Sequence, residues 1–140
     1  MIEKYVNVII KEAQKAYKKK EIPVGCIIVK NNKIISKGYN LKEKTQNCVN
    51  HAEIIAIIKA SKKIKNWRLE DCELYVTMEP CLMCCGAIIQ SRIKKVYFLI
   101  ENKKTGSSEI LRDYGIKIEK INVQNEYKNL ILSFFEKIRQ

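Results

Sequence analysis

Apolar residues recur along this chain with two different periods, one helical and one alternating. The helical period marks residues 2–20, 51–65, 81–92 and 124–139, so we expect four amphipathic or buried helices. In the first of them the apolar positions are Ile2, Tyr5, Val6, Ile9, Ile10, Ala13 and Tyr17. The second is almost wholly apolar on its core side, which predicts burial against a sheet through Ile54, Ile55, Ile57, Ile58 and Ile64.

Short β-branched runs predict five strands. Residues 24–30 and 34–40 meet across Asn31 and Asn32, and because asparagine tolerates a positive φ, this pair predicts a hairpin. Three further strands are expected at 73–77, 95–100 and 116–122.

The remaining segments complete the order of elements. Residues 41–50 are a polar stretch leading into the second helix, and residues 107–114 predict a short helix ended by Gly115. The order is therefore αββαβαβα(β)α, an α/β sandwich. No repeat, linker or low-complexity segment divides it, so we expect residues 1–140 to form a single domain.

Composition narrows the class of protein. The chain has 140 residues, 46% of them hydrophobic, and this length suffices for a core without crosslinks. Six cysteines fall short of a disulfide scaffold, and no run approaches the ~20 apolar residues of a membrane span, so we expect a cytoplasmic protein with reduced thiols and no membrane partner. The net charge of +12 suits a polyanion, although a bias toward lysine, isoleucine and asparagine fits genome composition equally well.

The residues that carry chemistry stand at the starts of two predicted helices. The only histidine, His51, opens the second helix, and Cys81 and Cys84 open the third. Cysteines three apart on a helix share one face, so both sulfurs reach one metal ion. One histidine and two thiolates leave one tetrahedral position for water, as in catalytic zinc sites. The pattern predicts one Zn²⁺ per chain.

Glu53 stands two residues after His51, still in the first helical turn. It can face the open position without binding the metal, so we expect it to carry protons. A lone C-x-x-C pair is more often redox-active, structural or merely buried, and a lone histidine is usually a surface residue. Together, H-x-E and P-C-x-x-C form the signature of zinc-dependent nucleobase deaminases.

In these motifs the chain resembles the bacterial tRNA-specific adenosine deaminases, which convert the wobble adenosine of a tRNA anticodon to inosine. The shared elements are Ile22-Pro23-Val24-Gly25, Gly38-Tyr39-Asn40, His51-Ala52-Glu53, Asn66-Trp67-Arg68-Leu69, Leu74 to Cys84, Gly86-Ala87, Ser91-Arg92-Ile93, Lys104-Thr105-Gly106 and Ser133-Phe134-Phe135. The resemblance implies the three-layer α/β/α cytidine-deaminase-like fold, with a mixed five-stranded sheet and helices on both faces. It also implies a homodimer, no organic cofactor and a tRNA anticodon stem-loop as the partner.

The same resemblance implies roles for residues outside the metal site. Asn40 and Ala52 should hold the target nucleotide, while Phe134, Phe135 and Arg139 should help to seat the anticodon loop. Each has a plainer interpretation. Asn40 fits a turn, and the spacing of the two phenylalanines favours the core over base stacking.

The chain departs from the family in three places. Cys85 replaces the usual alanine and lies about 100° around the helix from Cys84, so we expect a small buried residue. Asn102 replaces a common aspartate beside the expected RNA path, which bears on backbone contacts and on ribose discrimination. Residues 107–117 are short and look closer to the deaminase domain of riboflavin synthesis.

Two other functions stay open from the sequence. One keeps the chemistry but acts on a free base, nucleoside or nucleotide, such as guanine, cytidine, deoxycytidylate or a riboflavin precursor. The other is a non-catalytic RNA-binding protein with a closed zinc site, its fourth ligand coming from Cys72, Cys85 or Cys48. Glu53 argues against the second, because a structural site has no use for that carboxylate.

Overall fold

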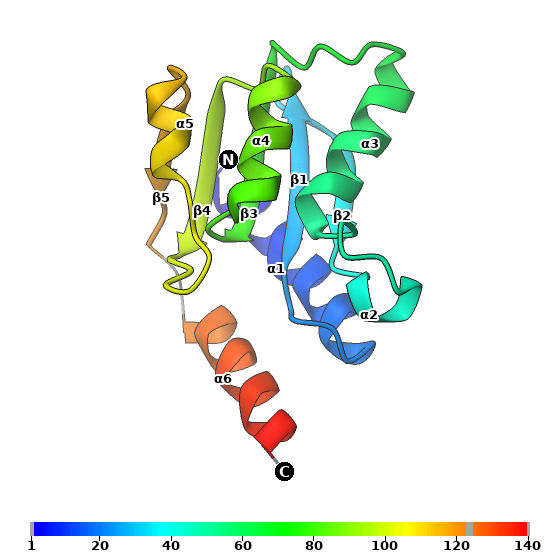
Figure 1. The fold of residues 1–140 in the computed structure, drawn as a ribbon, viewed down its shortest axis with the longest axis vertical. Coiled ribbons are helices and arrows are strands. Elements are labelled where there is room, and N and C mark those ends of the chain that lie inside the picture. Colours follow the sequence, from blue (N-terminus) through cyan, green and yellow to red (C-terminus); the bar gives the residue numbers. More distant parts are fainter. Residues whose placement is uncertain (1, 123–124, 140) are drawn as a thin grey trace.

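The computed structural model describes residues 2–122 and 125–139, without the side chain of Arg139 (Figure 1). Its elements follow the expected order, with one addition. They are α1 (Ile2–Lys18), β1 (Gly25–Lys30), β2 (Lys33–Tyr39), α2 (Lys42–Thr45), α3 (Ala52–Ile64), β3 (Cys72–Met78), α4 (Leu82–Gln90), β4 (Lys95–Ile100), α5 (Glu109–Asp113), β5 (Lys117–Lys120) and α6 (Asn125–Arg139). The addition is α2, a single turn inside the polar stretch 41–50, for which no helix is predicted.

The five strands form one mixed sheet in the order β2-β1-β3-β4-β5. β1 is antiparallel to β2 and β3, whereas β3, β4 and β5 are parallel. Asn31 and Asn32 form the β1–β2 turn with φ of 51° and 61°, as the hairpin signal predicts. The mixed five-stranded sheet is confirmed.

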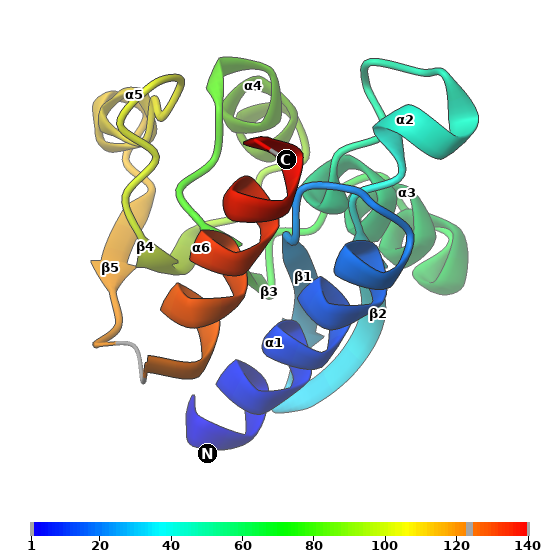
Figure 2. The ribbon, with the colours of Figure 1, turned by 90° about the horizontal axis from the view of Figure 1, so that it is seen from below.

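Helices cover both faces of the sheet (Figure 2). Side chains alternate along β1, so that Cys26 and Ile28 face α3, α4 and α5, while Ile27 and Val29 face α1 and α6. The same alternation in β3 and β4 completes two hydrophobic layers, one on each side. This is the expected three-layer arrangement. None of the helices in the described chain is both long and apolar enough to cross a membrane.

The buried face of α3 is made of small residues, which differs from the expectation. Its isoleucines are only partly buried, and Ile58 is exposed; the fully buried apolar positions are Ala52, Ala56 and Ala60. The reason is close approach. A Cβ added at Gly38 of β2 would meet the Ala52 carbonyl oxygen at 2.5 Å, so only small side chains fit between this helix and the sheet.

This arrangement brings two helix starts together at one end of the sheet. α3 begins just after the α2 turn, and α4 begins where β3 ends, at the lower edge in Figure 1. On the other face, α6 lies beside α1 and extends past that same lower edge.

Candidate metal centre

His51, Cys81 and Cys84 meet where α3 and α4 begin. His51 is the N-cap residue of α3 and Cys81 the N-cap residue of α4, both with extended backbone, while Cys84 lies in the first turns of α4. The His51 Nδ1 atom is 3.7 Å from the Cys81 Sγ and 3.6 Å from the Cys84 Sγ. The three ligand atoms all lie within 4.8 Å of one another, although His51 is far from Cys81 and Cys84 in the sequence.

This donor set fits zinc. One imidazole and two thiols from different elements converge without a fourth protein ligand among the described residues, which leaves the open position of a catalytic site. The other candidate cysteines lie elsewhere. Cys85 is fully buried and points its Sγ at the Pro80 carbonyl oxygen, Cys48 is exposed, and Cys72 begins β3 at the far end of the strand. A closed site with any of these as fourth ligand is therefore not formed.

Hydrogen bonds within the cluster shift the pKa values of the ligands. Contacts from Cys84 and His51 lower the pKa of Cys81 to about 3. The contact with Cys81, together with burial, raises the pKa of Cys84, and the contact with Cys81 also raises the pKa of His51. The shifts favour the thiolate at Cys81, the form that binds a metal ion. Zinc binding releases the protons that remain on its ligands.

Glu53 lies beside the cluster but outside the ligand set. It is the second residue of α3 and is only 4% exposed. Burial is the main cause that raises the pKa of its carboxyl group to about 7. A carboxyl group with such a pKa can accept and return a proton at neutral pH, as general acid–base chemistry requires.

Asn40 anchors the start of α3 through its side chain. Its Oδ1 accepts the Ala52 N–H at 2.9 Å, and its Nδ2 donates to the Ile22 carbonyl oxygen at 3.1 Å. His51 makes no side-chain capping bond, so Asn40 supplies the cap from the end of β2. One amide proton and one lone pair of Asn40 remain for a ligand. Its predicted contact with the target nucleotide stays a prediction.

The aromatic pair of α6 divides between core and surface. Phe134 is 6% exposed and meets Tyr17 of α1 edge-on, with ring centroids 6.3 Å apart. Phe135 is 41% exposed and meets the Phe134 ring edge-on, with centroids 5.5 Å apart, so that part of its ring is accessible to a ligand. The side chain of Arg139 lies outside the described residues. The expected RNA contacts of these three residues stay predictions.

Glu79 is a site residue that the sequence reasoning missed. Its carboxylate accepts the N–H groups of Asn102 and Ser108 at 3.1 Å each, and the Ser108 hydroxyl at 2.6 Å. These bonds hold the loop after β4 against Cys81, which forms an isolated bridge with Gly106. The signal was present in the sequence, since Glu79 directly precedes the Pro80-Cys81 pair.

Asn102 contributes to the same loop rather than standing free. Its Nδ2 donates to the Thr105 hydroxyl at 2.7 Å, and its Oδ1 accepts the Thr105 N–H at 3.2 Å. An aspartate here would keep the second bond and could accept the hydroxyl proton in the first. The replacement therefore preserves the loop while removing one negative charge.

Comparisons with known proteins agree with this geometry. Residues 1–100 match the family model described as the cytidine and deoxycytidylate deaminase zinc-binding region. A tRNA-specific adenosine deaminase from Bacillus subtilis is 40% identical over 147 residues, covering 99% of this chain and 91% of the relative. Another from Aquifex aeolicus is 40% identical over 145 residues, covering 98% and 95%.

Solved structures share the fold. A chain from a study of A-to-I editing by tRNA:A34 deaminases superimposes with a TM-score of 0.81 at 27% identity, covering 85% of this chain and 98% of that one. A guanine deaminase from Bacillus subtilis gives 0.69 at 29% identity, covering 98% and 92%. The bifunctional diaminohydroxyphosphoribosylaminopyrimidine deaminase/reductase from Thermotoga maritima gives 0.78 at 29% identity, covering 97% of this chain but 41% of that one.

Proposed function

Because the chain belongs to the tRNA-specific adenosine deaminase family, within the cytidine and deoxycytidylate deaminase zinc-binding superfamily, we infer that it deaminates adenosine to inosine at the wobble position of a tRNA anticodon. The observation that carries this function is the convergence of His51, Cys81 and Cys84 beside the buried carboxyl group of Glu53. A structural zinc site needs no such carboxyl group.

The chain's own residues account for the proton movements. His51, Cys81 and Cys84 would hold the zinc ion, which when bound would lower the pKa of a water molecule toward ~7 and so supply a nucleophile at neutral pH. Glu53 takes one proton of the attacking water and delivers it to N1 of the adenine as the bond from the water oxygen to C6 forms. Glu53 then takes the proton of the new C6 hydroxyl group and passes it to the amine, so that the C6–N6 bond breaks and ammonia leaves. Water and adenosine thereby become ammonia and inosine, and Glu53 returns to its initial state.

Asn40 and the start of α3 position the reacting base. The Asn40 cap fixes the Ala52 N–H and, with it, the first turn that carries Glu53. We propose that the remaining amide proton and lone pair of Asn40 bind the target nucleotide. This arrangement keeps Glu53 aligned with the base while the target is extruded from the anticodon loop.

The tRNA substrate is favoured over small bases by the degree of similarity. Two relatives that are 40% identical over 98–99% of this chain are both tRNA-specific adenosine deaminases. Among the solved structures, identity is similar for the tRNA:A34 deaminase chain and the guanine deaminase, 27% and 29%, but the TM-score is higher for the former, 0.81 against 0.69. The exposed ring of Phe135 on α6 offers a stacking surface that a free base has no need for.

We also propose a cytoplasmic homodimer in which residues 1–140 act as one deaminase domain. Exposed apolar side chains support the dimer, since Ile58 on α3 and Leu82 on α4 lie on the two helices that cover the same face of the sheet. Sedimentation of the zinc-loaded protein tests the dimer directly, and a monomer at micromolar concentration would contradict it.

The substrate is tested by offering the zinc-loaded protein several candidate substrates. An anticodon stem-loop with adenosine at the wobble position is compared with free guanine, cytidine and deoxycytidylate, and inosine or ammonia release is measured. We expect deamination of the stem-loop, and none after the metal is removed with a chelator. Preference for guanine or cytidine over the stem-loop would overturn the tRNA assignment.

A further inference from the structure

Glu21 is a buried carboxylate that the proposed reaction does not use. It follows α1 in the loop that leads to β1, and its side chain is only 1% exposed. Burying a carboxylate is costly unless its oxygens are hydrogen-bonded. No ion pair reaches Glu21 anywhere in residues 2–122 and 125–139, so its partners must be neutral groups.

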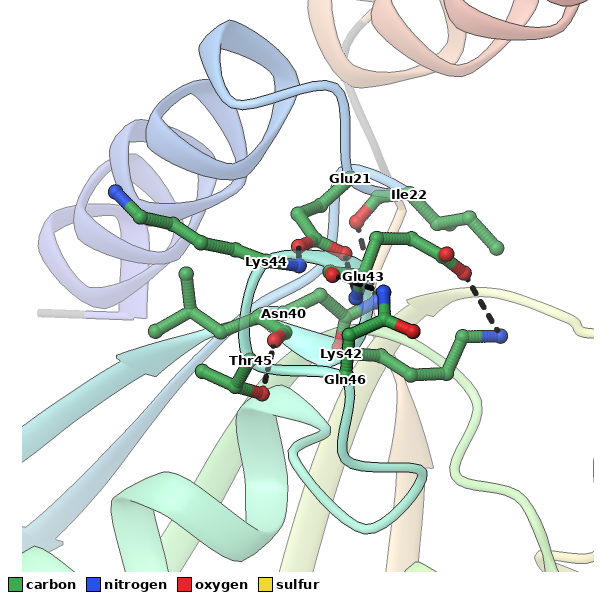
Figure 3. Close-up of polar contacts among 9 residues, drawn as sticks. Glu21, Ile22, Asn40, Lys42, Glu43, Lys44, Thr45 and Gln46 are labelled. Carbon is green, nitrogen blue, oxygen red and sulfur yellow. Dashed lines mark hydrogen bonds and ion pairs between the residues drawn. The ribbon is translucent and has the colours of Figure 1, made fainter.

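Those partners are two backbone N–H groups of the α2 turn. Glu21 Oε1 accepts the Glu43 N–H at 3.0 Å, and its Oε2 accepts the Lys44 N–H at 2.7 Å (Figure 3). The N-cap residue of α2 is Leu41, whose side chain makes no capping bond. A carboxylate from a distant part of the chain thus caps a helical turn that its own sequence leaves uncapped.

Nothing else of comparable strength holds this segment in place. Residues 41–50 close on themselves through the Leu41 N–H and the Asn50 carbonyl oxygen, 3.0 Å apart, and α2 buries none of its side chains. Glu21 makes the only side-chain hydrogen bonds that tie the described segment 41–50 to a remote part of the chain. The position of the segment therefore depends on this one carboxylate.

The segment connects two residues near the metal centre: Asn40 precedes it and His51 follows it. Asn40 is itself held by the carbonyl oxygen of Ile22, the residue next to Glu21. Glu21 and Ile22 together therefore fix the segment at its start and in its middle (Figure 3).

We propose that Glu21 is a positioning residue for RNA binding: it holds the exposed segment 41–50 in place at the edge of the active site before substrate arrives. The proposal rests on the proposed tRNA deamination. An exposed segment without a core must otherwise be ordered by the substrate, and that ordering weakens binding. The chemistry is less affected, because His51 is also fixed as the N-cap residue of α3, and Glu53 lies inside that helix.

The test compares Glu21→Gln with Glu12→Gln in zinc-loaded protein. A glutamine at position 21 keeps one acceptor but turns its NH₂ group toward the other backbone N–H. Glu12 is the matched control, because it is also a buried carboxylate, 4% exposed, but lies on α1 and contacts Lys15. Glu21→Met serves as the second variant, since it fills a similar volume without an unpaired buried polar atom.

Two readouts separate positioning from general stability. We expect Glu21→Gln to speed hydrogen exchange of the segment's amides at least tenfold, and to raise the KM for the stem-loop about tenfold while kcat stays within about threefold. Zinc content should match that of the parent, and Glu12→Gln should change neither exchange in the segment nor KM. If Glu21→Gln fails to fold, the same results are expected of Glu21→Met.

Unchanged exchange in residues 41–50, or an unchanged KM, would overturn the proposal. A fall in kcat with KM unchanged would overturn it as well, because that result places Glu21 in the chemistry. If the parent protein deaminates no stem-loop, the proposed function fails and with it the role in RNA binding, whereas the exchange measurement still decides whether Glu21 holds the segment.

Discussion

At the scale of single residues, three glutamates near the metal centre have different roles, although their carboxyl groups are chemically the same. Glu53 is buried, and this burial raises its pKa to about 7, which suits it for proton transfer. Glu21 and Glu79 instead place both oxygens on backbone N–H groups, which suits them for holding loops. The partner of the carboxylate, rather than burial alone, separates the catalytic residue from the positioning residues.

Replacement of Glu53 by Gln tests its role as the proton carrier. The amide is nearly isosteric but cannot carry a proton between water and the base, so we expect kcat to fall by about 10²- to 10⁴-fold. Zinc content and the thermal transition should match those of the parent. Substantial turnover by a metal-replete Glu53→Gln protein would rule out the proposed mechanism.

Phe134 and Phe135 provide a matched pair for the stacking role. Stacking of a base on an aromatic ring contributes about 1–3 kcal/mol, so Phe135→Ala should raise the KM for the stem-loop roughly 5- to 150-fold with little change in stability. Phe134→Ala should instead lower the melting temperature, because its ring is buried against Tyr17. Equal effects of both substitutions on KM would argue against the assignment of Phe135 as the stacking residue.

At the scale of elements, glycine in β2 allows α3 to lie close to the sheet. A Cβ at Gly38 would meet the Ala52 carbonyl oxygen at 2.5 Å and the Ala56 nitrogen at 3.0 Å, both backbone atoms that cannot rotate away. Ala52 also donates its backbone N–H to the Asn40 side chain. The close packing at Ala52 therefore helps to place the first turn of α3, which carries Glu53.

Gly38→Ala tests that close approach. We expect it to lower the free energy of unfolding by about 1–3 kcal/mol, because the helix must move away from the sheet. Gly86→Ala is the control, since a Cβ there meets nothing within 4 Å and alanine is the better helix former. Denaturant titration of both variants gives the comparison, and a Gly38→Ala protein as stable as Gly86→Ala would show that the backbone accommodates the methyl group.

The elements also show what the sequence could and could not predict. The hairpin, the metal ligands and the five strands follow from local signals: an asparagine pair, H-x-E, P-C-x-x-C and β-branched runs. The mixed arrangement of the sheet was implied by the resemblance to the deaminase family. The buried face of α3 was predicted from its isoleucines, but the alanines occupy it, because hydrophobicity does not reveal how near another backbone lies. Glu21 was missed for a related reason, since its partners are backbone N–H groups, which no sequence pattern identifies.

At the scale of the whole molecule, the metal centre, the 41–50 segment and the loop after β4 belong to one end of the sheet (Figure 1). Each side of the site is held by a glutamate from outside the ligand set, Glu21 on the α3 side and Glu79 on the α4 side. Because β1 is antiparallel to both β2 and β3, and β4 is parallel to β3, the strands β2, β3 and β4 all end at the same edge of the sheet, and the segments that follow them lie together there.

The net charge of +12 is the property of the whole chain that bears most directly on substrate. A polyanion that binds through lysine and arginine releases counterions, so the logarithm of its affinity falls linearly with the logarithm of salt concentration, by about 0.7 per phosphate contact for single strands. With about four contacts, affinity for the stem-loop should fall roughly 50-fold between 50 and 200 mM salt. Lysines that merely keep the surface solvated would give no such slope.

Binding rather than turnover gives the cleanest measurement of that slope. Fluorescence anisotropy with the Glu53→Gln protein avoids conversion of the labelled stem-loop during the titration. The substitution is at a buried position, so it leaves the charged surface intact. We expect a slope between about −2 and −4, and the same slope for a stem-loop with guanosine at the wobble position, because phosphate contacts do not depend on the base. A slope near zero would mean that the positive charge of this chain takes no part in RNA binding, and that recognition depends on the base pocket and the α6 aromatic ring alone.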